Sequence, residues 1–230
     1  MSTISKRTLL ALSALTFGTL ALASCSSGGA GSEGGSDQGS ENTDSTPETF
    51  TVLSADELGG IIEGLGFEML PQDQVEQAAA GVSSTSYDSI EPAACEEVLV
   101  TSSLLTDDAS AAIGTSQAEQ MTAAAFSYPD SAMIDEAFSM YNADTIAACP
   151  EYTATTQGME ITGTIEVIDV TVDGADEAIG IAETASLSGS EVTSTRVLAS
   201  KGGVLVNVMS MAGDADAATS TATEVVGELP

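Results

Sequence analysis

Apolar residues recur along the chain at two spacings, and the change of spacing divides the chain into predicted helices and strands. Apolar positions three and four residues apart indicate an amphipathic helix, whereas alternate apolar positions indicate a strand. The first helical pattern follows Ser54, with Glu57 three residues later as in a capping box, and Gly66 is suited to end the helix. Its apolar face consists of Leu58, Ile61, Ile62 and Leu65.

Three further segments carry the helical pattern. A short helix is predicted over 72–80, and Cys95 is expected at a turn or at the start of another short helix. A longer helix is predicted from Asp130 or Ser131 to near Cys149, where Pro150 prevents continuation. A last helix follows Asp214 or Asp216, and its apolar face holds Ala218, Ala222, Val225, Val226 and Leu229.

Strand patterns occupy most of the rest of the chain. They cover 98–105, 117–128, 151–157, 159–172, 177–187 and 191–211, and the last contains a hairpin turn at Lys201-Gly202-Gly203. The short connections favour an antiparallel meander. The apolar parity switches near Val167 and Ile168, which indicates a β-bulge. We therefore predict an α+β fold: an antiparallel sheet of about five to six strands with helices mainly on one face, in a single domain over 50–230.

The N-terminal residues have the pattern of an export signal. Lys6 and Arg7 precede an apolar run that is shorter than the roughly 20 residues of a membrane-spanning helix. The run ends in Leu22-Ala23-Ser24-Cys25, which resembles a bacterial lipobox. That resemblance implies a signal peptide over 1–24, a lipid on the sulfur of Cys25, and a protein anchored at the outer face of the cytoplasmic membrane. An ordinary secretory signal with an incidental Cys25 is the alternative.

Residues 25–49 are rich in Gly, Ser and acidic residues, with almost no large apolar side chain. Such a segment buries too little surface to offset the entropy of ordering. We expect it to be a flexible tether between the anchor and the domain.

Charge excludes one class of partner. All 35 acidic residues follow Cys25, and only Arg196 and Lys201 are basic there, so residues 25–230 carry a formal charge of −33. A field of this sign repels nucleic acid and anionic lipid. We expect no nucleic acid partner. The charge serves solubility or salt tolerance, or it gathers cations or a basic partner.

The amino-acid composition also limits the kinds of catalytic and metal sites that the protein can form. The chain has no histidine, which argues against histidine-dependent hydrolases and imidazole-ligated zinc. Asp173, Asp176 and Glu177 form one acidic group and Asp214 with Asp216 another, but neither matches a calcium loop, so we interpret them as turn and cap residues. No catalytic residue, metal site or cofactor is predicted.

Two cysteines remain after Cys25, namely Cys95 and Cys149. In an oxidising compartment they are expected to form one disulfide. A redox-active pair is the alternative, although the chain has no Cys-x-x-Cys spacing.

Glu183 has the parity of its apolar strand neighbours and is therefore expected to face inward. An inward carboxylate is costly unless it is paired or opens to a cleft, and Arg196 lies on the neighbouring predicted strand. We expect Glu183 and Arg196 to mark the floor of a polar cleft. The alternative is that a bulge or twist turns Glu183 to solvent.

The order of these features resembles that of the PknH-like extracellular domain, over about Leu53 to Leu229. The features are Cys95, the helix ending at Cys149, the meander closing at Lys201-Gly202-Gly203 and the final helix. Members of that family usually hold two disulfides and a tryptophan before the second of these cysteines. This chain has one cysteine pair and no tryptophan, with Thr145 and Ile146 in that neighbourhood. The resemblance implies sensing of a ligand or partner outside the membrane and brings no catalytic residue.

The sequence thus predicts a membrane-anchored, non-enzymatic binding or sensor module at the cell envelope, acting on an envelope ligand or protein. One alternative is a carboxylate-dependent hydrolase of cell-wall glycan. The other is a passive acidic assembly factor of the envelope.

Overall fold

The computed structural model describes residues 48–82, 87–99, 104, 106, 108–139 and 141–230. They belong to a compact unit, Ser45–Pro230, and a second unit, Met1–Asp44, lies outside the described residues. The predicted signal peptide, Cys25, the tether up to residue 47, Met140 and residues 83–86 and 100–103 are also outside them.

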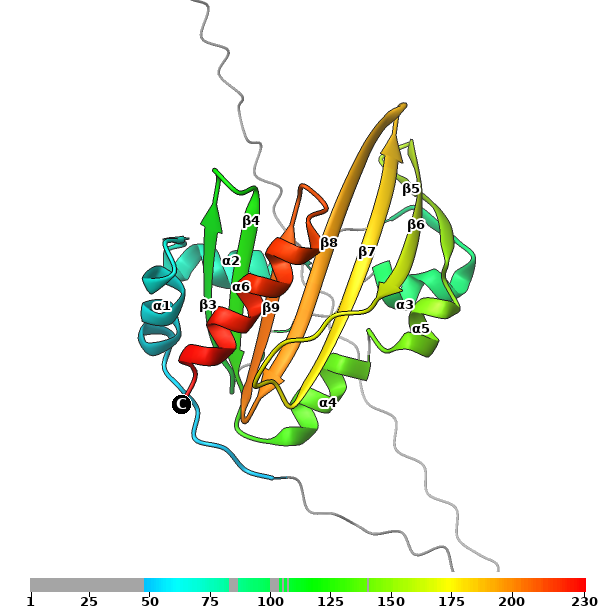
Figure 1. The fold of residues 1–230 in the computed structure, drawn as a ribbon. Coiled ribbons are helices and arrows are strands. Elements are labelled where there is room, and N and C mark those ends of the chain that lie inside the picture. The colour runs from blue at the N-terminus through cyan, green and yellow to red at the C-terminus, as the bar shows by residue number, and fades with distance from the viewer. Residues whose placement is uncertain (1–47, 83–86, 100–103, 105, 107, 140) are drawn as a thin grey trace, which may run out of the picture. The chain divides into compact units, whose positions relative to one another are not determined.

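One nine-stranded antiparallel sheet forms the centre of the described unit, in the order β1-β3-β4-β9-β8-β7-β6-β5-β2 (Figure 1). The strands are β1 (Glu68–Met69), β2 (Ser89–Glu91), β3 (Ser110–Ser116), β4 (Met121–Ser127), β5 (Glu151–Thr156), β6 (Met159–Ile168), β7 (Glu177–Leu187), β8 (Ser190–Lys201) and β9 (Val204–Ser210). The antiparallel meander and the hairpin at Gly202-Gly203 are confirmed.

The predicted number of five to six strands was too low. β1 and β2 have two and three residues, too few to show alternation, and β3 is built from small residues. The strand predicted over 98–105 was wrong at its start, because Val98 and Leu99 belong to the helix α3.

Six α-helices and one 3₁₀ turn are described. They are α1 (Ala55–Gly64), α2 (Gln72–Val82), η1 (Ala93–Cys95), α3 (Glu96–Leu99), α4 (Ser131–Ser139), α5 (Ala143–Ala147) and α6 (Ala215–Glu228). The predicted capping box of α1 is present: Glu57 N–H donates to Ser54 Oγ, and Ser54 N–H donates to the Glu57 carboxylate. The single helix predicted from Asp130 to Cys149 is instead two helices, because Asn142 accepts a hydrogen bond from Thr145 N–H and starts α5.

Helices cover both faces of the sheet, so the prediction that they lie mainly on one face was wrong. Residues of α1 and α6, such as Leu58 and Val226, share one buried cluster with Val197 of β8. Residues of α2, α3, α4 and α5 share a second cluster with Leu198 of β8. Consecutive residues of the central strands are therefore buried on opposite sides, a pattern typical of a strand between two layers. Figure 1 shows α6 in front of β8 and β9 and α3 behind the sheet.

The bulge predicted near Val167 is also wrong. β6 pairs with β7 in unbroken register from Ile161 opposite Leu187 to Ile168 opposite Gly180. The apolar parity switches because the strand ends at Ile168, after which Val170 and Val172 pack into the cluster beneath α6.

Candidate functional site

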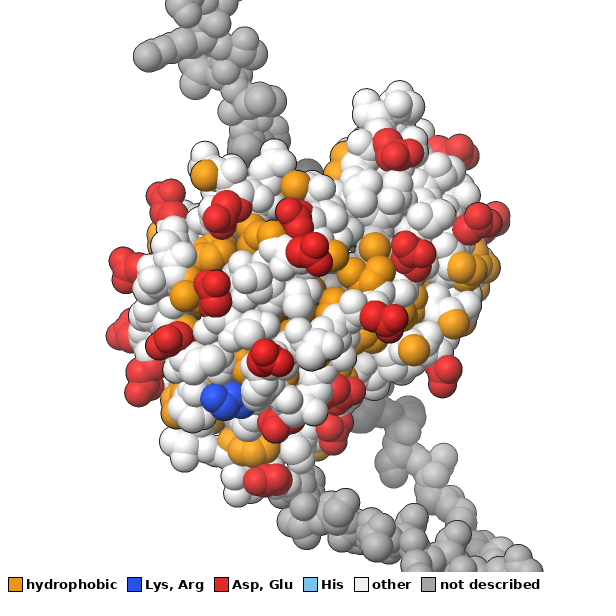
Figure 2. Space-filling model, viewed as in Figure 1, with side chains coloured by type: hydrophobic (Ala, Val, Ile, Leu, Met, Phe, Trp, Pro, Cys, Tyr) orange, Lys and Arg blue, Asp and Glu red, His pale blue; other side chains and the backbone are white. Residues whose placement is uncertain are grey.

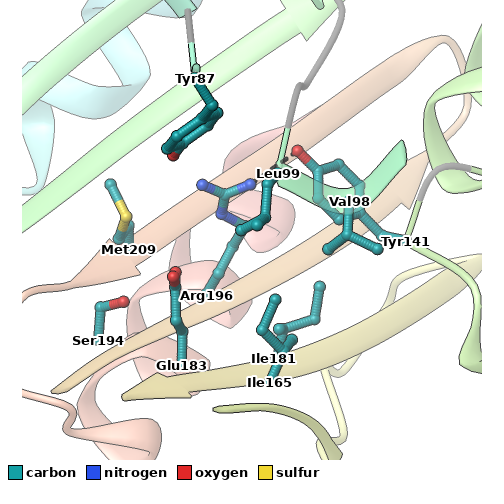
Figure 3. A pocket seen from close by; sticks show the side chains of 10 residues that line it. All are labelled: Tyr87, Val98, Leu99, Tyr141, Ile165, Ile181, Glu183, Ser194, Arg196 and Met209. Carbon is teal, nitrogen blue, oxygen red and sulfur yellow. Dashed lines mark hydrogen bonds between the residues drawn. The ribbon is translucent and has the colours of Figure 1, made fainter. Parts of the chain in front are cut away.

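A cavity of about 130 Å³ lies on the sheet face covered by α2 to α5. Figure 3 shows side chains from the sheet, from α3 and from the two flanking tyrosines converging on it. It is lined by Tyr87, Val98, Leu99, Tyr141, Ile165, Ile181, Glu183, Ser194, Arg196 and Met209.

Glu183 and Arg196, the two residues expected to form a cleft floor, both line this cavity. In the register of β7 and β8, Ile181 is opposite Arg196 and Glu183 is opposite Ser194. The two charged residues are therefore diagonal neighbours on one face, a relation that separates their backbones by about 7–8 Å. Both are half-buried. Their role in ligand binding stays a prediction.

Arg196 is held by an aromatic side chain. Its Nη1 donates a hydrogen bond of 2.7 Å to Tyr141 Oη, and its guanidinium carbon lies 5.2 Å from the centroid of the same ring. A cation within about 6 Å of an aromatic face is attracted by the ring quadrupole. In the part of the chain that the structure describes, no carboxylate forms an ion pair with Arg196, although the protein has 35 acidic residues. Tyr141 thus positions the cation, and no carboxylate of the described residues is its counter-ion.

Glu183 is likewise held by a tyrosine rather than by Arg196. Its Oε1 accepts a hydrogen bond of 2.7 Å from Tyr152 Oη. Burial, then this hydrogen bond, holds the pKa of Tyr152 far above its usual value. Burial also raises the pKa of Tyr87, with a smaller contribution from the Glu183 charge. Both phenols therefore remain neutral donors at physiological pH.

A glycine allows Tyr152 to reach Glu183. A Cβ on Gly163 would lie 2.5 Å from the Tyr152 ring, closer than any side chain tolerates. Gly163 on β6 therefore lets the ring lie flat over its backbone, with the hydroxyl directed towards β7. Any larger residue at this position would displace the partner of the Glu183 carboxylate.

The predicted disulfide between Cys95 and Cys149 is confirmed. It ties the 3₁₀ turn that leads into α3 to the residues that follow α5. Both cysteines are fully buried. The bond therefore fixes the helix that carries Val98 and Leu99, which form part of the aliphatic wall of the cavity.

Two of the acidic residues that the sequence assigns to turns and caps, Asp214 and Asp176, have structural roles. Asp214 accepts a hydrogen bond from Ala217 N–H at the start of α6, and Asp176 accepts one from Gly202 N–H. Lys201 Nζ donates to the carbonyl oxygens of Val226 and Leu229 at the end of α6. Among the described residues, no group of three or more potential ligands could hold a metal ion.

Acidic side chains are spread over the face drawn in Figure 2 rather than gathered into one patch. On that face, opposite the cavity, lies a wider hollow of about 360 Å³. Its lining is largely Thr and Ser side chains of β5, β6 and β7, with Glu151 and Glu191 at its two sides.

Sequence reasoning missed the three tyrosines of the site. Tyr141 has the spacing of the apolar face of the helix that was predicted up to Cys149, and Tyr87 lies in a polar stretch that predicts only a loop. Nothing in the local pattern distinguishes Tyr152 from an ordinary strand aromatic. Only the tertiary fold brings these three tyrosines to one site.

The described part of the chain contains no helix long and apolar enough to cross a membrane. No family model and no curated protein matches the chain. Among solved structures, it is similar to the extracellular domain of PknH from Mycobacterium tuberculosis, with 16% identity and a TM-score of 0.47 over 77% of this chain and 97% of that one. It is also similar to an Rv0999 ortholog from Mycobacterium smegmatis, with 13% identity and a TM-score of 0.40 over 60% of this chain and 74% of that one.

Proposed function

We propose that the protein is an exported, lipid-anchored binding module at the outer face of the cell membrane, without enzymatic activity, and that its ligand site is the cavity of Glu183 and Arg196. The observation that carries the proposal is that two opposite charges share one cavity, each held by a tyrosine and not by the other. Two half-buried charges that do not neutralise each other are costly to a fold. A ligand that pairs with them offsets that cost.

Lipid anchoring is supported by Leu22-Ala23-Ser24-Cys25, and export is also supported by the disulfide. Expression of the full chain in a bacterial host with labelled fatty acid tests this part. We expect label and membrane association in the parent chain, and loss of both in Cys25→Ser. A matched control, Ser26→Ala, should keep both. An unlabelled parent chain in the culture medium would overturn the anchor.

The hydrolase alternative has less support from the described hollows. Glycoside hydrolysis uses two carboxyl groups about 5–9.5 Å apart. The cavity contains one carboxylate, Glu183. In the wider hollow, Glu151 on β5 and Glu191 on β8 are three strand spacings apart, which is roughly 14 Å at about 4.8 Å per spacing.

A thermal-shift screen of small charged and polar metabolites against the purified full chain tests the binding function. We expect at least one compound to raise the unfolding temperature of the parent chain, because a ligand that binds only the native state stabilises it. The same compound should have no effect on Arg196→Met. Failure of every compound, or an equal response from Arg196→Met, would contradict the assignment of the cavity. Release of soluble products from cell-wall material would favour the hydrolase.

A further inference from the structure

Both charged groups of the cavity have unused hydrogen-bonding capacity. A guanidinium has five N–H donors, and within the described residues Arg196 makes one hydrogen bond, to Tyr141. A carboxylate has two oxygens, and among those residues Glu183 accepts one hydrogen bond, at Oε1. Figure 3 shows both charged ends pointing into the cavity, with the Tyr87 hydroxyl facing them. The site therefore offers donors for an anionic group and an acceptor for a cationic one.

The charge of the protein selects between ligand classes. A free anion would meet the field of a chain whose residues 25–230 carry a formal charge of −33. A free cation would be drawn to Glu183 but opposed by Arg196 in the same cavity. A molecule that carries both charges has no net charge to be repelled and pairs with both groups.

The size and walls of the cavity limit the size of the ligand and the nature of its uncharged part. An enclosed cavity of about 150 Å³ accommodates benzene, which has six heavy atoms. A cavity of about 130 Å³ therefore suits a ligand of roughly that size. The aliphatic wall of the cavity consists of Val98 and Leu99 of α3 and of Ile165 and Ile181, which lie on the sheet beside Glu183 and Arg196. A short aliphatic side chain fits against it.

We infer that the ligand is a small zwitterion of the α-amino acid class, with the size of alanine. This inference rests on the proposed binding function. The carboxylate pairs with the free N–H groups of Arg196, which can engage two oxygens at once. The ammonium donates to the free oxygen of Glu183, and the methyl group contacts the aliphatic wall.

Titration calorimetry on the purified full chain tests this inference with four probes: L-alanine, D-alanine, propionate and ethylamine. Propionate retains the carboxylate and the methyl group but has no ammonium. Ethylamine retains the ammonium and the methyl group but has no carboxylate. We expect at least one alanine enantiomer to bind about ten- to a hundredfold more tightly than either analogue, because each analogue leaves one charged group of the cavity without its partner.

Two variants and two controls assign the binding to the cavity. Arg196→Met and Glu183→Gln should each weaken alanine binding by about ten- to a hundredfold. Lys201→Met is the control for Arg196→Met, because it removes the same charge. Glu166→Gln is the control for Glu183→Gln, because it removes the charge of an exposed carboxylate on β6. Both controls should retain alanine binding. Equal loss in a variant and its control would overturn the inference, because the effect would then reflect net charge alone.

The outcomes separate this inference from the proposed function. If propionate or ethylamine binds as tightly as alanine and Arg196→Met abolishes that binding, the cavity is a ligand site but the zwitterion class is wrong. If no alanine enantiomer binds while another compound of the thermal-shift screen does, the class is again wrong. If nothing binds in either experiment, both proposals fail.

Discussion

The two basic residues of β8 lie on opposite sides of the sheet and are used in different ways. Lys201 faces α6 and donates to two of its last carbonyl oxygens, at 3.2 Å from Val226 O and 2.6 Å from Leu229 O. Arg196 faces the cavity and donates to a tyrosine hydroxyl. A cation at a helix C-terminus satisfies unpaired carbonyls and the negative end of the helix dipole. Lys201 therefore has a complete structural explanation, whereas Arg196 does not.

The surroundings of Arg196 make the difference informative. A purely structural cation in so acidic a chain would be expected to meet a carboxylate, and the nearest candidate on the sheet is Glu183. Tyr141 and Tyr152 instead hold the two groups separately. The cavity side of the sheet thus retains two separated charges, whereas the described basic residue on the α6 side, Lys201, is bound to the end of a helix. That contrast is the basis of the functional proposal.

Removal of the disulfide should have the largest effect and should fall on the cavity side. We expect Cys95→Ala/Cys149→Ala to lower the free energy of unfolding by about 4 kcal/mol, from the chain entropy of a loop with a sequence separation of 54. Urea unfolding measures this change. Alanine binding should be lost as well, because α3 carries Val98 and Leu99 of the aliphatic wall. Unchanged binding in the double alanine variant would show that the wall does not depend on the disulfide.

Lys201→Met should have a smaller effect, on the α6 side alone. We expect a loss of about 1–2 kcal/mol in the free energy of unfolding, from the missing hydrogen bonds and the helix-end charge. Amide hydrogen exchange should show faster opening of the last turn of α6. Slower exchange or unchanged stability would contradict the capping role of Lys201.

The tyrosines provide a pH test of the cavity charge. Burial first, and Glu183 second, raise the pKa of Tyr87. Burial and the hydrogen bond to Glu183 raise that of Tyr152 further. A raised pKa in the folded state contributes stability that is complete below the unfolded value, about 10, and is lost as the pH rises through the folded value.

Ultraviolet titration of the phenols should therefore show late ionisation of Tyr87 and Tyr152, together with falling stability above about pH 10. Glu183→Gln should lower the pKa of both phenols, because it removes the negative charge. Glu166→Gln is the matched control and should leave both titrations unchanged. A Glu183→Gln titration identical to that of the parent chain would place the Glu183 charge outside the cavity.

Arg196→Met should have the smallest effect on stability. The lost hydrogen bond and ring contact are worth about 1–2 kcal/mol together, and removal of a half-buried charge offsets much of that. We expect a change within about 0.5 kcal/mol in urea unfolding, at the scale of ordinary surface substitutions. A loss as large as that of Lys201→Met would make Arg196 a structural residue and would remove the contrast between the two sides.

Local sequence signals predicted the features that depend on neighbouring residues. The capping box of α1, the hairpin after Lys201 and the inward parity of Glu183 each follow from residues within a few positions of one another. The disulfide followed from counting cysteines in a chain that the N-terminal pattern predicts to be exported. These features require no knowledge of which strands become neighbours.

The failures involve features that depend on the tertiary fold. β3 has few large apolar residues, so its pairing with β4 is visible only in the assembled sheet. Burial on both faces removes the alternation that would indicate one solvent-exposed face, and the distribution of the helices over both faces was therefore not predicted. Tyr87 and Tyr141 of the cavity and Tyr152, the partner of Glu183, come from three separate segments, and each has an ordinary local explanation. The sequence thus indicated the charged floor but not the side chains that hold its charges apart.

The most direct test is an NMR spectrum of the arginine Nε–H groups of the full chain, recorded as alanine is added. Arg196 is the one arginine after Cys25, and Arg196→Met identifies its signal by its loss. We predict that alanine shifts the Arg196 signal in a saturable manner. An Arg196 signal that does not move at saturating alanine, or that moves equally with propionate, would contradict the account.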